Sequence, residues 1–530
     1  SGMTPKEQLD KIYEAVARIQ DGDTFGLVGM TLSGSPEEIL KEMERSFLEE
    51  GHPRSLTFVH AAGISDKVGG MNRLGHEGML KRVIGSHWGL APNMMDLITN
   101  NKVEAFCMPL GVLSHLHNCV SRREPGLITK TGLGTFVDPR YEGGKMNELT
   151  KELGEEMIQL IDVDGEEYLK YKYTKFDHLI IRGTYADEAG NISTIDEGCV
   201  QELLPAVLAT KKFGGKVIVQ VRQKVAKNSL PPKEVTIPGV FVDYVVVSEK
   251  PFENHRQTSG WYQDDTYSGQ RKAPFAELDV IPLTERKVIG RRAMMQLKAD
   301  SVINVGTGIP NDTVGPILAE EKLMDDIMVT VESGIYGGVP AGGMDFGISQ
   351  NAVALIAVND QFDFYEGAGV DFTFMGCGEL DAKGNVNATK MGKIAPGSGG
   401  FVDITSAAKN VVFCSTFMGK GLRVKFDEEK GVEIVQEGKI CKVVKEVLQV
   451  SFNGRLANQR GQNVFYVTER CVFKINEDGP ESIEVARGID LQKDILDKME
   501  FTPKISSDLK EIPTMIYREG RFGLKDYILS

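Results

Sequence analysis

The sequence predicts an α/β protein made of two similar open α/β domains in tandem, and three observations indicate this fold. Apolar, β-branched runs alternate with helix-length amphipathic segments along most of the 530 residues, which is typical of parallel α/β units. Two stretches, 25–63 and 301–334, share the order strand, glycine-containing turn, helix, strand. A chain of this length also exceeds what one hydrophobic core supports, so at least two domains are expected.

The two repeats match element by element. Each enters its helix through a G-x-P turn, at 34–36 in the first repeat and at 308–310 in the second. Ser35 as cap, Pro36 at the first helical position and Glu38 three residues after the cap predict the first helix start. The second strand of each repeat ends in a polar residue, His60 in the first and Glu332 in the second. Glu332 therefore lies at the carboxyl end of a parallel strand, where open α/β sheets place ligands.

The remaining elements complete two domains, which we place at 3–280 and 281–530. The polar, aromatic-dotted segment 248–275 is interpreted as a linker or exposed arm within the first domain. A helix over 284–300 opens the second domain, and strands are expected at 351–358, 372–376, 410–416 and 463–475. Ser1 and Gly2, which precede Met3, are interpreted as an expression remnant.

Composition excludes several function classes. The net charge of −14 leaves no basic excess to neutralise nucleic-acid phosphates. Seven cysteines are scattered singly, without a C-x-x-C pair, which favours a reduced cytoplasm and argues against structural zinc. No apolar run approaches membrane-spanning length. We therefore expect a cytoplasmic protein with no metal site and with no nucleic-acid or membrane partner.

Glycine turns from a strand into a helix are anion sites, so a dinucleotide-binding domain is a real alternative. In that reading Glu332 would bind a ribose. The full G-x-G-x-x-G is missing, however, because Asn311 stands where the third glycine should be, and no Walker loop is present. Downstream, Gly397–Gly400 can present a backbone N–H to an oxyanion, although an ordinary β-turn is the commoner role of such glycines.

Several motifs together resemble the family I CoA-transferases, closest to the bacterial branch that acts on acetate, propionate and other short-chain acyl groups. They are "ESGIYGG" at 332–338, "GAGVDFTF" at 367–374 with "GNVN" at 384–387, "PGSGGF" at 396–401, and "TKTGLGTFVDPRYEGGKMN" at 129–147. The resemblance covers nearly the whole chain. It implies the tandem α/β fold, coenzyme A and acyl-CoA as substrates, no tightly bound cofactor, and a homodimer or homotetramer.

The resemblance also implies the site. Glu332 matches the glutamate that attacks the acyl-CoA thioester and becomes linked to CoA, by ping-pong nucleophilic catalysis. The expected backbone donor to the oxyanion is Gly399 or Gly400. The residues expected to contact CoA are Gly306, Gly308, Ile309, Gly337, Gly338 and Gly397, and Lys390 and Lys393 are weaker candidates for its phosphates.

One residue departs from the family pattern. Related transferases carry P-Q-G near the acyl group, whereas this chain has Pro109-Leu110-Gly111, and leucine cannot donate a hydrogen bond. Either the backbone loop acts alone, or another side chain substitutes, or the acyl pocket is retuned toward apolar groups. The alternatives to a transferase are an acyl-CoA hydrolase, a non-catalytic sensor of acyl-CoA or sugar phosphate, and a nucleotide-dependent oxidoreductase.

Overall fold

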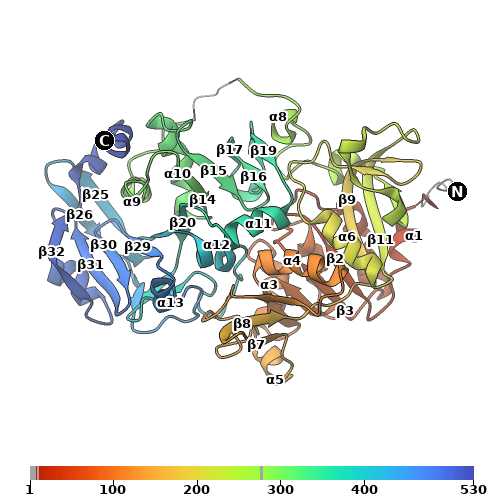
Figure 1. Ribbon diagram of the computed structural model, residues 1–530, viewed down its shortest axis with the longest axis horizontal. Coiled ribbons are helices and arrows are strands. Elements are labelled where there is room, and N and C mark those ends of the chain that lie inside the picture. The colour runs from red at the N-terminus through yellow and green to blue at the C-terminus, as the bar shows by residue number, and fades with distance from the viewer. Residues whose placement is uncertain (1–6, 9–10, 275–277) are drawn as a thin grey trace. The chain divides into compact units, whose positions relative to one another are not determined.

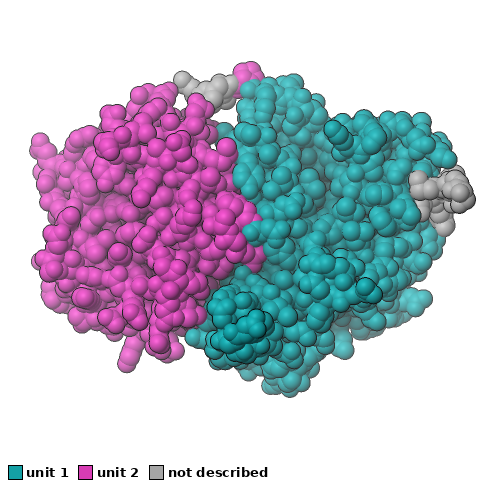
Figure 2. Space-filling model, viewed as in Figure 1, with its two compact units in different colours: residues 1–273, 331–363, 393–403 teal, residues 274–330, 364–392, 404–530 magenta. Residues whose placement is uncertain are grey.

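The computed structural model describes residues 7–8, 11–274 and 278–530 (Figure 1). It divides into two compact units, which Figure 2 shows in different colours. Unit 1 comprises residues 1–273, 331–363 and 393–403, and unit 2 comprises 274–330, 364–392 and 404–530. Glu332 and the glycines at 397–400 thus pack with the first 273 residues. The domain boundary near 280 stays a prediction, and the Ser1–Gly2 remnant lies outside the described residues.

Unit 1 is organised around a largely parallel sheet. Strands β2 and β3, which form the first repeat, are parallel neighbours, and β9 pairs with the other side of β2. The chain therefore winds outward in both directions from β2, as in doubly wound sheets. In spatial order the strands are β1 (Glu7–Gln8), β13 (Tyr244–Val247), β11 (Lys216–Val225), β9 (His178–Asp187), β2 (Thr24–Leu27), β3 (Leu56–His60), β4 (Leu80–Gly85) and β5 (Glu104–Cys107), with β10 (Ile192–Ser193) and β12 (Val235–Ile237) beside β9.

The first repeat is confirmed as β2, α2 and β3, but its helix start differs from the prediction. Helix α2 begins at Glu37, so Pro36 is the cap residue, and no side chain caps the helix. The Ser35 hydroxyl instead donates to Glu37 Oε1 at 3.0 Å. The helices of unit 1 are α1 (Ile12–Val16), α2 (Glu37–Glu50), α3 (Pro92–Thr99), α4 (Leu110–Ser121), α5 (Glu148–Glu152), α6 (Leu203–Lys212), α7 (Pro251–Asn254), α8 (Asp265–Ser268) and α11 (Val358–Glu366), whose last residues belong to unit 2.

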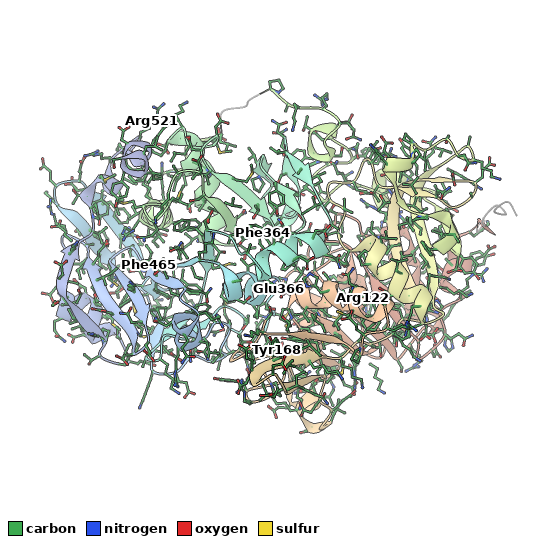
Figure 3. All side chains as sticks on the ribbon, viewed as in Figure 1. Arg122, Tyr168, Phe364, Glu366, Phe465 and Arg521 are labelled. Atoms are coloured by element: carbon green, nitrogen blue, oxygen red, sulfur yellow. The ribbon has the colours of Figure 1, made fainter. Side chains whose placement is uncertain are left out.

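Unit 1 also contains several short strands. A three-stranded sheet contains β8, on which Tyr168 is labelled in Figure 3. The segment 248–274 contains α7 and α8 and buries polar side chains such as Gln257 and Thr258. The small strands are β6 (Leu127–Thr129), β7 (Ile158–Val163), β8 (Glu166–Tyr171), β16 (Ile335–Tyr336), β17 (Val339–Pro340), β18 (Ser349–Gln350) and β19 (Ala354–Leu355).

Unit 2 repeats the same topology. Strands β14 and β15 flank helix α10 (Ile309–Glu320), and β20 pairs with the other side of β14. The sheet continues through β23 to β29, on which Phe465 is labelled in Figure 3, and then through antiparallel strands. In spatial order its strands are β15 (Met328–Val331), β14 (Val302–Val305), β20 (Phe372–Gly376), β23 (Asn410–Cys414), β29 (Asn463–Val467), β30 (Cys471–Asn476), β31 (Gly479–Val485) and β32 (Lys504–Glu511).

The strands expected at 372–376, 410–416 and 463–475 are confirmed, the last as the pair β29 and β30. The strand expected at 351–358 is wrong, because only Ala354–Leu355 is extended and α11 begins at Val358. The other elements of unit 2 are α9 (Glu285–Met294), α10 (Ile309–Glu320), α12 (Phe401–Ala407, shared with unit 1), α13 (Gly454–Gln459), α14 (Leu524–Leu529), β21 (Glu379–Asp381), β22 (Val386–Asn387), β24 (Met418–Gly419), β25 (Arg423–Asp427), β26 (Gly431–Gln436), β27 (Ile440–Cys441) and β28 (Val443–Val444).

Each sheet buries its own apolar side chains. In unit 1, Phe25 and Phe58 on adjacent strands are fully buried and stack with ring centroids 5.0 Å apart. In unit 2, one cluster joins α9 and α10 to the sheet through residues such as Val288 and Ile317. These cores fix the carboxyl ends of the parallel strands, where the functional loops emerge.

Candidate active site

The glycine loop, Gly397–Gly400, lies on the carboxyl edge of the sheet in unit 1. Gly399 N–H donates to Ser86 O at 2.9 Å, and Leu110 N–H donates to Gly399 O at 3.0 Å. His87 and Gly397 form an antiparallel bridge. The loop is therefore held by residues that follow β4 and β5, about 300 positions earlier in the chain.

The segment that carries Glu332 is tied to the same edge. Glu332 directly follows β15, and its neighbour Ser333 donates from Oγ to Gly347 O at 2.6 Å. The loop after β2 holds the far end of this turn, because Thr31 Oγ1 donates to Phe346 O at 2.9 Å. Two segments that sequence reasoning placed in the second half thus both anchor on loops of the first sheet.

Glu332 is a recessed and unpaired carboxyl group. Its side chain has no hydrogen bond or ion pair with any residue that the structure describes, and it is only partly exposed. Burial raises the pKa of Glu332 to about 7, because the surrounding protein disfavours the charged form and no cation of a described residue offsets that cost. Such a carboxyl group is typical of a functional site.

The backbone N–H groups of the glycine loop differ in their hydrogen bonding. Gly399 N–H is already engaged with Ser86, whereas Gly400 is buried and its N–H has no partner among the described residues. Gly397 needs to be glycine, because its φ is +90° and a Cβ would lie 2.4 Å from Ser86 O. The geometry therefore favours Gly400 over Gly399 as the donor to an oxyanion.

The glycines after Glu332 have a structural reason that the sequence did not reveal. A Cβ at Gly337 would lie 2.6 Å from Val353 Cγ2, and one at Gly338 would lie 2.3 Å from Gln350 O. Both have positive φ, of 70° and 76°. Close packing of this turn against residues 350–353 thus explains why both positions are glycine. Their contact with CoA stays a prediction.

Unit 2 contains a cavity of about 320 Å³ at the carboxyl ends of β14, β20 and β23. Gly308 and Ile309 at the start of α10 line it, together with Lys390 and Lys442. Helix α10 has no side-chain cap, so its first N–H groups and its dipole favour an anion there. The position between β14 and β20, where the strand order reverses, is where doubly wound sheets bind ligands.

Lys442 is a cavity-lining cation that sequence reasoning missed. Its Nζ donates to Thr416 Oγ1 at 2.9 Å and to Ser415 Oγ at 3.2 Å, and no carboxylate of a described residue lies within 4.0 Å. Burial is the main cause that lowers the pKa of Lys442. Gly306 lies deeper. A Cβ added there would lie 2.8 Å from Met375 Sδ, so close packing explains why this position is a glycine.

The sequence profile of the coenzyme A transferase family matches residues 9–248. The chain is also 44% identical to caffeate CoA-transferase from Acetobacterium woodii over 517 residues, which are 96% of this chain and 97% of that protein. The chain is a family I coenzyme A transferase. It is 38% identical to acetate CoA-transferase YdiF of Escherichia coli K12, over 96% of this chain and 95% of that protein.

Solved structures agree with this assignment. The transferase chain matches the apoenzyme of acyl-CoA transferase YdiF from Escherichia coli O157:H7 with a TM-score of 0.91 and 36% identity, covering 99% of this chain and 98% of that one. A thioester complex of that same protein with CoA matches with a TM-score of 0.90 and 36% identity over 98% and 97% of the two chains. The predicted α/β fold and the predicted enzyme class are confirmed.

The residue that departs from the family pattern, Leu110, is buried. Leu110 is 2% exposed and starts α4, with Gly111 beside it, also buried. The Leu110 backbone holds the glycine loop through Gly399. The leucine side chain thus contributes to packing at the base of this loop, and it offers no hydrogen bond to a substrate.

Other titratable residues of the transferase have structural partners. His60 is a buried histidine, and its Nδ1 lies 2.7 Å from Ala62 O. His115 contacts Asn359 O and His117 contacts Tyr173 Oη. Within the described ranges, no cluster of His, Cys, Asp or Glu is suited to a metal ion, and no helix is long and apolar enough to cross a membrane. Burial raises the pKa of the Cys377 thiol to about 11, which favours a packed thiol over a nucleophile.

Proposed function

We propose that this enzyme moves CoA from a short-chain acyl-CoA to a carboxylate such as acetate, through a glutamyl-CoA thioester on Glu332. One observation carries the proposal. Glu332 is a recessed carboxyl group without a partner among the described residues, and its segment and the glycine loop are held by the same edge of one sheet. A nucleophile and an oxyanion donor on a shared rigid edge are what acyl transfer requires.

The reaction has two half-reactions, and each half-reaction consists of two displacement steps. A carboxylate oxygen of Glu332 attacks the thioester carbonyl carbon, the C–S bond breaks, and CoA leaves as a thiolate. This step leaves a mixed anhydride between the acyl group and Glu332. The thiolate then attacks the glutamyl carbonyl carbon, and the original acyl group leaves as a carboxylate. An acceptor carboxylate reverses both steps, so the kinetics are ping-pong.

Gly400 N–H is the proposed donor to the oxyanion, since it has no partner among the described residues, whereas Gly399 N–H is bonded to Ser86 O. Burial raises the pKa of Glu332 to about 7. The carboxylate is therefore more basic and a better nucleophile. At neutral pH about half of the enzyme then holds Glu332 ionised, which suits a weak nucleophile working near pH 7.

The cavity of unit 2 is the proposed site for the phosphates of CoA. The α10 N-terminus and Lys442 supply a local positive field in a protein whose net charge is −14. Lys390 also lines this cavity, which supports its candidacy from the sequence. Binding energy gained at this distant group can be used at the reacting carbonyl.

The acyl specificity is the finer part of the proposal. Relatives named for acetate and for caffeate share 38% and 44% identity with this chain, so the two substrates are direct competitors. The buried Leu110 favours acyl groups somewhat bulkier or more apolar than acetate. We also propose that the enzyme is a cytoplasmic homodimer or homotetramer.

The test is a transfer assay with acetyl-, propionyl-, butyryl- and caffeoyl-CoA as donors and acetate as acceptor, followed by separation of the CoA esters. Parallel lines in double-reciprocal plots and fastest transfer from a short-chain donor support the proposal. Fastest transfer from caffeoyl-CoA would reassign the substrate. Thiol release that does not require acetate would instead identify a hydrolase, in which water takes the anhydride or thioester.

A further inference from the structure

His87 is placed between the two anchored segments of the candidate site. Its backbone forms a bridge with Gly397 of the glycine loop. On its other side, a Cβ at Gly63 would lie 3.0 Å from His87 Nδ1, so the ring packs directly on that glycine. Gly63 O in turn accepts a 2.8 Å hydrogen bond from Thr31 N, and Thr31 Oγ1 binds Phe346 O. A continuous series of contacts within unit 1 thus joins the glycine loop, His87 and the segment that carries Glu332.

The His87 ring occupies a slot that two glycines leave open. A Cβ at Gly89 would lie 2.7 Å from His87 Cε1 and 2.9 Å from Nε2, so any side chain there would displace the ring. Pro396, which precedes the glycine loop, lies 3.4 Å from the same Cβ position. Gly63 and Gly89 therefore let the ring lie against the start of the loop.

The ring is recessed, partly exposed and unpaired. Neither ring nitrogen of His87 has a hydrogen-bond partner among the described residues, in contrast to His60, His115 and His117. Burial lowers the pKa of His87 to about 4, so the ring is neutral at pH 7. A neutral imidazole carries one N–H donor and one acceptor nitrogen.

We infer that His87 donates a hydrogen bond from its ring to the oxygen of the reacting acyl group, in place of the side-chain donor that Leu110 lacks. The inference rests on the proposed function, since it takes the glycine loop as the oxyanion site. The ring keeps its proton throughout, so the bond-making and bond-breaking steps at Glu332 are unchanged. A donor of this kind stabilises the negative charge that develops on the acyl oxygen when Glu332 attacks the thioester carbonyl carbon.

The experiment measures the single-turnover rate of CoA adduct formation on the protein, with propionyl-CoA and without acceptor. His87→Ala is expected to slow this step about 100-fold, the usual effect of removing one oxyanion donor. His87→Asn, which restores an N–H donor, is expected to recover part of the rate. CoA binding, followed by calorimetry, should change less than about threefold in both variants, because the interaction strengthens only in the transition state.

Gly89→Ala tests the same ring without removing it. The new methyl group collides with Cε1 and Nε2, so it should slow adduct formation tenfold to about 100-fold in the wild-type background. In the His87→Ala background it should have no further effect, because the ring that it displaces is gone. This pair of variants also guards against a folding defect, since Gly89 is exposed.

The matched control is His52→Ala, a surface histidine of the same unit that pairs with Asp21. Its rate should equal that of the wild type. Wild-type rates in His87→Ala, or equal losses from Gly89→Ala in both backgrounds, would overturn the role of His87. Failure of the wild-type enzyme to form any adduct would refute the proposed function itself, which is a separate and distinguishable outcome.

Discussion

Replacing Glu332 by glutamine should make the protein more stable, and the gain should appear as the pH rises. Burial raises the pKa of this carboxyl group from 4.5 to about 7, so between these pH values the folded protein keeps a proton that the unfolded chain has lost. The free energy of unfolding therefore falls with rising pH across this interval and levels off above it. Below pH 4.5 both states are protonated, and the group contributes no pH dependence.

The size of this effect follows from the same two pKa values. Each pH unit in the interval is worth about 1.4 kcal/mol, so the whole interval amounts to about 3 kcal/mol. Glutamine carries no charge at any of these pH values and avoids the cost. For a unit of a few hundred residues this corresponds to a rise in melting temperature on the order of 5 °C.

The assay is thermal and urea unfolding of the wild type and of Glu332→Gln from pH 5 to pH 8 at constant ionic strength. The stability of the variant relative to the wild type should rise across this range and reach its maximum above pH 7. Glu152→Gln, at an exposed position of α5, is the control and should show no such rise. A difference between Glu332→Gln and the wild type that does not depend on pH would refute the view that burial disfavours the charged form of Glu332.

Four further predictions concern activity and CoA binding. Because only the carboxylate form of Glu332 attacks, kcat/KM for the acyl-CoA should rise about tenfold per pH unit below pH 7 and level off above it. A pH–rate profile measures this dependence, and a flat profile from about pH 5.5 to about pH 8 would contradict it. Gly400→Pro removes the free N–H and should lower kcat about 100-fold or more, whereas an unchanged kcat would exclude this donor. Lys442→Ala should raise the Kd for CoA about tenfold, measured by calorimetry, and Lys409→Ala on the exposed surface of unit 2 should not. Leu110→Gln should shift the order of kcat/KM over an acyl-CoA series toward acetyl-CoA; an unchanged order would reject the retuned pocket.

Local patterns made much of the fold predictable from the sequence. The alternation of apolar strands with amphipathic helices depends on nearest neighbours, and it located both repeats and the strand at 372–376. The strand expected at 351–358 failed because its apolar residues are divided between a two-residue strand and the start of α11. The N-cap of α2 is Pro36, one residue after Ser35, the cap that the side-chain pattern predicted.

The candidate site was predictable where a motif is contiguous, and not where it depends on distant contacts. Glu332 and the glycine loop were found from short stretches, but their anchoring on Thr31 and Ser86 joins residues about 300 positions apart. Lys442 and His87 carried no signal, since a single lysine or histidine in a long chain is usually structural. Only their positions, beside the α10 N-terminus and beside the glycine loop, distinguish them.

The most direct test of the central claim is the intact mass of the protein after incubation with acetyl-, propionyl- or butyryl-CoA in the absence of acceptor. The account predicts a covalent adduct of the mass of CoA, mapped by peptide digestion to Glu332 and absent from Glu332→Ala. An adduct on another residue, or tight binding of acyl-CoA with neither adduct nor thiol release, would contradict the assignment of Glu332 as the residue that carries CoA.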